Sequence, residues 1–342
     1  MVTLHRLWLR AMAVSSRPIL IGPWRSEVGF EALYWLPWLE GWRARYRISK
    51  DRLVAVTRGG AGVWYDAKLT ADLYDYVPIE KIRKAMLADA QRTGSVKQYE
   101  MAIWERKLLP LIAEDLGVSR YHVLHPSRMY HDLTPFWQGT LGALDAVSHL
   151  RFTPPLVPTP PLSLALPEKY VAVRFYARAT WPYQEATAAW VVALVEQLAK
   201  TTTVVLLHTG LSLDDHWDFP VAGPNIMSLE GHCTAQNNLA VQSAVLAKSI
   251  GFVGTYGGTM QLAVRLGKPA IGFFQTLQGT CYAHKQLTEW LAVQQQTPCF
   301  IVRPQDGTYL EEVMRHAVGA WPVSSSSAGR RDEGTLRAKR IG

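Results

Sequence analysis

The sequence predicts an α/β protein built from two Rossmann-like domains that face each other across a cleft. The chain has 342 residues, which is more than a single hydrophobic core usually supports, so two domains of roughly 150 residues each are expected. Short apolar runs alternate with helical patterns along the chain, and this alternation is typical of a parallel sheet covered by helices on both faces. A stretch with six prolines near the middle, residues 151–168, favours an extended linker between the two domains.

The alternation of strands and helices is most regular after this linker. Strand-like apolar runs are found at 170–175, 203–208, 225–229, 250–254, 269–274 and 299–303, and helical patterns at 184–200, at 236–248, directly after Gly258 and near 282–294. The first half is less regular, with strands expected at 18–22, 52–57 and 121–125 and helices around 28–42, 79–92, 97–116 and 136–148. The expected division is a basic N-terminal extension at 1–17, domains at 18–150 and 169–322 joined by the linker, and a disordered basic tail at 323–342.

The positive charge of the protein is concentrated at its two ends. The net charge is +8, but residues 1–17 carry three arginines and no acid, and residues 330–342 carry five basic residues and two acids. The body between them is close to neutral. A nucleic-acid-binding domain should carry a basic face of its own, so we expect no nucleic-acid partner.

The remaining composition favours a cytoplasmic protein. Three cysteines are too few and too widely spaced for a disulfide framework or a zinc site. The N-terminus carries charges every few residues, and no run reaches the roughly 18 apolar residues that span a bilayer. Contact with a membrane surface stays open beside an ordinary frayed terminus, through Leu4, Leu7, Trp8, Arg6 and Arg10.

Residues suited to phosphate binding follow three of the strands expected in the second half. They are Arg174 and Arg178 after the first strand, His208, Thr209 and Gly210 after the next, and Tyr256, Gly257, Gly258 and Thr259 before a helix. Because the carboxyl ends of parallel strands meet at one rim of the sheet, these residues should come together there. Guanidinium groups and helix N-termini both bind phosphate oxygens, so we expect a diphosphate site. Taken singly, the two glycines would serve only the turn, and Arg178 would be a solvated charge.

The stretch TYGGTMQLA at 255–263, followed by LGKP at 266–269 and an apolar strand, resembles the nucleotide-sugar site of glycosyltransferases with the GT-B fold. It is most similar to the heptosyltransferase-like branch, which has a Ser/Thr-Gly turn, a helix with His-Leu-Ala, and Leu-Gly-x-Pro before the next strand. Here Tyr256 stands at the Ser/Thr position and Gln261 at the His position. The strand VAVRF at 171–175 is also similar to the first donor-domain strand of fucosyltransferase-type members.

The resemblance implies that the second domain binds the nucleotide sugar and that the first domain faces it from the acceptor side. The rim residues would then hold the donor diphosphate without a metal or other cofactor, and the segment 308–321 would fold back on the first domain. Glu27 and Glu31 follow the first strand and are the candidate bases for the acceptor hydroxyl, with Asp66 behind them. Either glutamate could instead serve only to meet the dipole of the helix that follows.

The sequence therefore predicts a metal-independent glycosyltransferase that moves a sugar from a nucleotide-sugar donor to a glycan or lipid-linked glycan acceptor, in the cytoplasm or at the membrane surface. Two other functions stay open. A nucleotide-sugar 2-epimerase with the same fold would need no acceptor pocket, and a non-catalytic glycan-binding or scaffold protein would keep the fold without the base. The helical spacing of Trp35, Trp38 and Trp42 predicts a stripe of core residues before it predicts a sugar platform.

Overall fold

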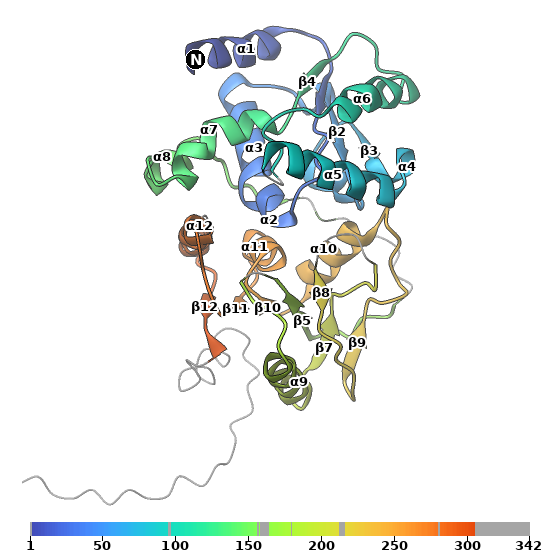
Figure 1. Cartoon of the computed structure of the whole chain (residues 1–342), viewed down its shortest axis with the longest axis vertical. Coiled ribbons are helices and arrows are strands. Elements are labelled where there is room, and N and C mark those ends of the chain that lie inside the picture. The colour runs from blue at the N-terminus through green and yellow to red at the C-terminus, as the bar shows by residue number, and fades with distance from the viewer. Residues whose placement is uncertain are drawn as a thin grey trace, which may run out of the picture.

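The computed structural model describes residues 2–94, 97–155, 157, 164–178, 180–211, 216–279 and 281–304. The helix expected at 308–321 and the tail expected at 323–342 lie outside these residues. The described part of the linker, 151–155, 157 and 164–168, contains no helix or strand. Figure 1 shows the two halves of the chain as two lobes, one above the other.

The first lobe is organised around a parallel sheet with the strand order β3-β2-β1-β4. Its strands are β1 (Ile19–Ile21), β2 (Leu53–Thr57), β3 (Leu69–Asp72) and β4 (His122–Leu124). The three strands expected here are confirmed. The sequence does not indicate β3, because this edge strand, LTAD, is short, mostly half-exposed and without an apolar run.

The helices of the first lobe are α1 (Val2–Val14), α2 (Val28–Phe30), α3 (Leu36–Tyr46), α4 (Leu73–Tyr76), α5 (Ile79–Thr93), α6 (Ile103–Asp115), α7 (Ser127–Trp137) and α8 (Ala143–Val147). A π-helical turn, Glu31–Trp35, joins α2 to α3, and 3-10 turns occupy Lys50–Arg52 and Ala61–Tyr65. The helix expected at 136–148 is wrong, since α7 and α8 stand there with a break between them. The sequence misled because prolines usually interrupt helices, whereas Pro126 precedes α7 and Pro135 lies inside it.

The N-terminal segment is a packed helix. Leu9, Met12 and Ala13 on α1 are buried in the core of the first lobe. Arg52 donates hydrogen bonds of 2.8 and 3.0 Å to the carbonyls of Ala13 and Met12, which satisfies the end of this helix. The frayed terminus expected from the sequence is therefore wrong for residues 2–14, because the apolar spacing on one face of the segment is sufficient for docking.

The second lobe is built on a parallel sheet with the order β12-β11-β10-β5-β7-β9. Its strands are β5 (Tyr170–Arg174), β7 (Thr203–Leu206), β9 (Ile226–Ser228), β10 (Gly251–Thr255), β11 (Ala270–Phe273) and β12 (Cys299–Val302), and its helices are α9 (Glu185–Ala199), α10 (Asn238–Lys248), α11 (Gly258–Arg265) and α12 (Cys281–Gln294). The short strands β6 (Tyr176–Ala177) and β8 (Trp217–Asp218) pair antiparallel beside it. The strands and helices expected between 170 and 303 are confirmed.

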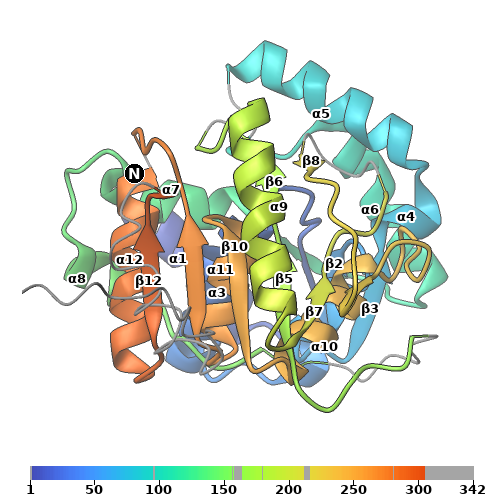
Figure 2. The same cartoon turned by 90° about the horizontal axis from the view of Figure 1, so that it is seen from below.

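Helices cover both faces of this second sheet. Figure 2 shows α9 in front of the strands, where its Val191 and Val195 pack in one cluster with Val171 and Val173. On the opposite face α10, α11 and α12 lie between the sheet and the first lobe (Figure 1). Their buried side chains belong to the same core cluster as the tryptophans of the first lobe, so the two lobes share one hydrophobic interior.

Polar contacts also hold the lobes together. The Gly59 carbonyl accepts from the backbone N–H groups of Leu239 and Ala240, at 2.8 and 3.0 Å, and so satisfies the start of α10. Arg265 on α11 is fully buried and donates to the carbonyls of Ala32, at 2.6 Å, and Thr153, at 3.0 Å. The predicted fold class, two parallel α/β domains facing each other, is confirmed. In the described part of the chain, no helix combines the length and the apolarity needed to cross a bilayer.

Candidate active site

The loop after β1 brings the first lobe against the second. Gly22 has a φ of +116°, and a Cβ there would lie 2.2 Å from the Val56 carbonyl oxygen, so only glycine fits this close crossing. The peptide between Gly22 and Pro23 is cis. The loop continues to Glu27, directly before α2, and α2 lies next to α11 of the second lobe (Figure 1). We call this contact of residues 26–30 with 256–261 the seam.

Glu27 is the carboxylate at the centre of the seam. Its Oε1 accepts a hydrogen bond of 2.8 Å from Nη2 of Arg178 and lies 3.2 Å from Nζ of Lys97. Burial raises the pKa of Glu27, but the charges of Lys97 and Arg178 lower it further, to about 2. The glutamate is therefore ionised at neutral pH, and it joins the loop after β1 to a guanidinium of the second lobe.

Lys97 is the site residue that the sequence analysis missed. It lies in the loop between α5 and α6, and its Nζ is 3.6 Å from the ring centre of Phe30 on α2, a cation–π contact. No local pattern marks it, since its partner Glu27 is 70 positions away in the chain. Its position depends on a buried ion network, which the sequence does not reveal.

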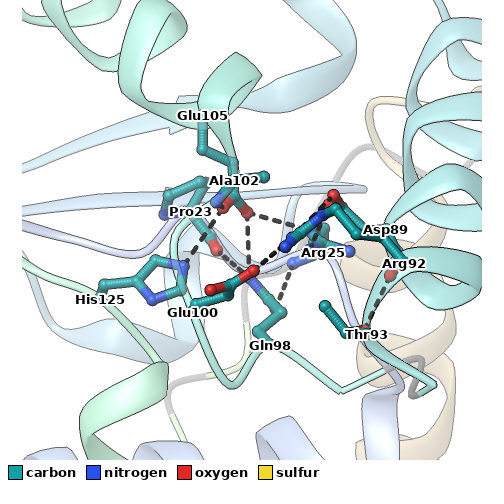
Figure 3. A network of polar contacts seen from close by, with 10 residues as sticks. All are labelled: Pro23, Arg25, Asp89, Arg92, Thr93, Gln98, Glu100, Ala102, Glu105 and His125. Carbon is teal, nitrogen blue, oxygen red and sulfur yellow. Dashed lines mark hydrogen bonds and ion pairs between the residues drawn. The ribbon is translucent and has the colours of Figure 1, made fainter.

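That network ties the Glu27 loop to the Lys97 loop (Figure 3). Arg25 donates from Nε to Glu105 at 2.8 Å and from Nη2 to Asp89 at 3.1 Å. Its backbone N–H donates to Gln98 at 3.1 Å, and Gln98 donates in turn to the Pro23 carbonyl at 2.9 Å. Because Arg25, Gln98 and Glu105 are all buried, these bonds are made in a low-dielectric interior and fix both loops firmly.

Arg174 lies at the carboxyl end of β5, where the sequence analysis expects it. Its guanidinium donates 3.1 Å to Gln242 of α10 and lies 3.3 Å from a carboxylate oxygen of Asp218. Arg174 and Thr259 line the same small cavity, together with Val28 of the first lobe. Arg174 thus lies beside the start of α11, and Arg178 reaches the seam through Glu27.

The start of α11 differs in detail from the expected open phosphate cradle. Gly257 has extended backbone with φ 172°, and a Cβ on it would lie 2.0 Å from the Tyr176 hydroxyl. A Cβ on Gly258 would lie 2.7 Å from the backbone nitrogen of Gly29. Gly258 therefore also serves the close approach of α2 to α11, and Gly257 leaves room for the Tyr176 hydroxyl. Tyr256 is buried in the shared core.

The second candidate base, Glu31, occupies a different environment. It is fully buried and accepts hydrogen bonds from Thr57 at 3.0 Å, Tyr65 at 2.5 Å and Arg58 at 2.9 Å. Burial raises the pKa of Glu31, and the Arg58 charge acts against this rise. Three donors therefore already satisfy this carboxylate in the interior.

The residues after β7 lie at the same rim of the sheet. The His208 ring nitrogen Nε2 is 2.9 Å from the Ser228 hydroxyl and 3.5 Å from Glu230. Gly210 has a φ of +70°, in the left-handed region that favours glycine, and Thr209 is buried. These residues follow β7, which pairs with β5, the strand that carries Arg174.

One further contact crosses between the lobes. The hydroxyl of Tyr34, in the π-helical turn, lies 2.6 Å from Nδ1 of His284 on α12. Burial lowers the pKa of His284 to about 3, and the nearby Lys97 charge adds to this effect. The imidazole of His284 is therefore neutral at neutral pH. Its Nδ1 can accept a buried hydrogen bond from the Tyr34 hydroxyl.

Two parallel α/β domains that meet at such a seam form the GT-B architecture expected from the sequence. Neither a protein-family model nor a curated protein matches this chain. Similar solved structures include TibC, a dodecameric iron-containing heptosyltransferase in complex with ADP-D-beta-D-heptose, from enterotoxigenic E. coli. It is 12% identical, with a TM-score of 0.40, and the similarity covers 76% of this chain and 59% of TibC.

Two further similar structures span nearly the whole of their own chains. The E. coli heptosyltransferase WaaC, solved with ADP, is 13% identical over 86% of this chain and 99% of WaaC, with a TM-score of 0.47. The family 9 glycosyl transferase of Veillonella parvula is 10% identical over 90% of this chain and 91% of its own, with a TM-score of 0.44. These proteins are of the kind that the sequence motif resembles.

Proposed function

We propose that this protein is a glycosyltransferase that moves a sugar from a nucleotide-sugar donor to a glycan acceptor, with Glu27 as the base. The observation that carries the proposal is the seam itself. A carboxylate of one lobe lies 2.8 Å from an arginine of the other, beside a helix N-terminus and a half-buried lysine. Sugar transfer needs these two parts, a cationic site for the leaving diphosphate and a base for the acceptor.

The donor side of the proposal rests on charge. Arg174, Arg178 and the N-terminus of α11 converge from one rim, and Lys97 approaches from the first lobe. Rigid guanidinium forks and a helix N-terminus stabilise the negative charge that develops on a departing diphosphate. In this proposal these groups take the role that a divalent cation has in metal-dependent transfer.

The acceptor side rests on the pKa of Glu27. At a pKa of about 2 a carboxylate is a weak base, and its strength grows when its cationic partners turn elsewhere. A bound diphosphate would compete with Glu27 for Arg178 and Lys97, and so raise the pKa of Glu27 while donor is present. The acceptor oxygen then attacks the anomeric carbon, its proton passes to Glu27, and the bond from that carbon to the phosphate oxygen breaks, with the electron pair leaving on the nucleoside diphosphate.

We further propose that the acceptor is a glycan carried on a lipid, reached at a membrane surface in the cytoplasm. The side chains of Arg6, Leu7 and Arg10 on α1 are exposed, and Trp8 is 37% exposed. Exposed basic and apolar side chains on one helix bind anionic lipid surfaces. Co-sedimentation with anionic vesicles, lost on Trp8→Ser together with Arg10→Ala, supports this docking, and binding that persists in the double variant refutes it.

A nucleotide-sugar screen tests the main proposal. The purified protein is incubated with donors that differ in base and sugar, with and without lipid-linked glycans, and the released nucleoside diphosphate is measured. Glu27→Gln should lower kcat about 100-fold or more with little change in donor binding, whereas Glu31→Gln, the matched control, should lower stability more than kcat. Isomerisation of a donor without acceptor would identify an epimerase, and absence of nucleotide binding would leave a glycan-binding role.

A further inference from the structure

Two histidines and an aspartate converge where α1 meets α7, away from the seam. His5 comes from α1, while His131 and Asp132 are neighbours on α7. One ligand atom from each of the three lies within 4.8 Å of the other two. His5 and Asp132 are 127 positions apart in the chain, so no local sequence motif indicates the cluster.

The distances between these side chains fit a shared ion as well as they fit separate ion pairs. Nε2 of His5 is 3.1 Å from Oδ1 of Asp132, and Nδ1 of His131 is 3.6 Å from the same oxygen. Zinc binds nitrogen and oxygen ligands at about 2.0 to 2.2 Å in a tetrahedral arrangement, which places neighbouring ligand atoms roughly 3.3 Å apart. Small side-chain rotations are sufficient to bring all three atoms around one ion.

The surroundings of His5 also favour a bound ion. Its ring is buried, and neither of its nitrogens makes an aligned hydrogen bond, although Nε2 approaches Asp132 closely. A buried imidazole without an aligned hydrogen bond lacks a polar partner, which a bound ion would supply. The second carboxylate oxygen of Asp132 accepts a hydrogen bond of 3.0 Å from the Trp38 indole, as metal-bound carboxylates are commonly held by an outer partner.

We propose that His5, His131 and Asp132 bind a zinc-type transition-metal ion that fastens α1 to α7. Two imidazoles and one carboxylate suit zinc, and three protein ligands leave a fourth position open. Calcium and magnesium are disfavoured because they prefer all-oxygen ligand sets.

A hollow in the first lobe borders two of the three ligands. The hollow has a volume of about 810 Å³, and His131 and Asp132 form part of its wall. Its other walls include the aromatic rings of Trp38, Trp42 and Tyr46. A water molecule or a small ligand in this hollow can therefore complete the coordination, and the site shares no residue with the seam.

The test is a zinc titration of the full-length, tag-free protein after chelator treatment. Calorimetry should show one zinc ion per chain, and added zinc should raise the melting temperature. His131→Ala and Asp132→Asn should each weaken binding at least tenfold and abolish the thermal shift. His232→Ala, which removes a histidine of the second lobe, is the matched control and should bind zinc as the parent does.

Two results would overturn the site. One is a parent protein that binds no stoichiometric zinc. The other is a His131→Ala variant that binds as the parent does. If Asp132→Asn fails to fold, His131→Ala still decides the question, since the His131 side chain is 47% exposed and its loss removes little packing. Neither result depends on the proposed sugar transfer, because no donor or acceptor is present.

Discussion

The carboxylate of Glu27 should make the stability of the protein depend on pH in a specific window. Its folded-state pKa of about 2 lies below the ordinary value of 4.5. The ionised group therefore stabilises the folded state above about pH 4.5, and this contribution is lost as the pH falls through about 2. Glu27→Gln cannot titrate, so the difference in unfolding free energy between parent and variant should shrink across that window.

The size of this effect follows from the lowered pKa. A change of one pKa unit corresponds to about 1.36 kcal/mol, so the shift from 4.5 to about 2 is worth roughly 3 kcal/mol. The Glu27 side chain is 28% exposed, and solvent screens part of its interaction with Arg178 and Lys97. We therefore expect the parent to lose about 2 to 3 kcal/mol more than Glu27→Gln between pH 6 and pH 2.

Urea unfolding followed by tryptophan fluorescence at a series of pH values measures this difference. Glu168→Gln, at an exposed position, is the control and should stay within about 0.5 kcal/mol of the parent throughout. A difference between parent and Glu27→Gln that stays constant from pH 6 to pH 2 would refute the reasoning. It would mean that Arg178 and Lys97 do not hold the carboxylate in its charged form.

Two further predictions concern the contact between the lobes. Gly258→Ala should lower the melting temperature without ligand, because its Cβ would lie 2.7 Å from the Gly29 nitrogen. Gly142→Ala is the control, because the atom nearest to its Cβ would be a side-chain oxygen at 3.5 Å. If both variants melt at the temperature of the parent, the close approach of α2 to Gly258 is contradicted. Arg265→Ala should cost about 3 kcal/mol or more, since it leaves a cavity and two unsatisfied carbonyls. Chemical denaturation measures this cost. A loss of unfolding free energy below about 1 kcal/mol would show that the buried guanidinium does not hold the two lobes together.

The sequence predicts the second lobe well because its central strands β10 and β11 are fully buried. Runs such as Gly251–Thr255 and Ala270–Phe273 are continuous and buried, and glycine or proline lies at or next to their ends. The first lobe is harder to predict because its elements gain stability from distant partners. Helix α1 forms on the core of the lobe, and α7 contains Pro135, so local propensity understates both.

The positions of the site residues could be predicted only where the arrangement of parallel strands determines them. The ends of parallel strands must share a rim, so Arg174 could be placed from the sequence. Lys97 could not, because the buried bonds of Arg25 and Gln98 bring its loop to Glu27 (Figure 3). The glycines at the start of α11 were expected to face a phosphate. The structure adds a second constraint on Gly258, the adjacent backbone of α2, which no pattern within residues 255–263 contains.

The central claim is that the seam binds a nucleoside diphosphate through Arg174, and calorimetric titration with ADP, UDP, GDP and CDP tests it most directly. The parent should bind at least one of these at a single site, and Arg174→Ala should weaken that binding by about 2 to 4 kcal/mol, as expected for loss of a charged hydrogen-bonding partner. Arg106→Ala, at an exposed position on α6, should leave it unchanged. A parent that binds none of the four, or an Arg174→Ala variant that binds as tightly as the parent, would contradict the account.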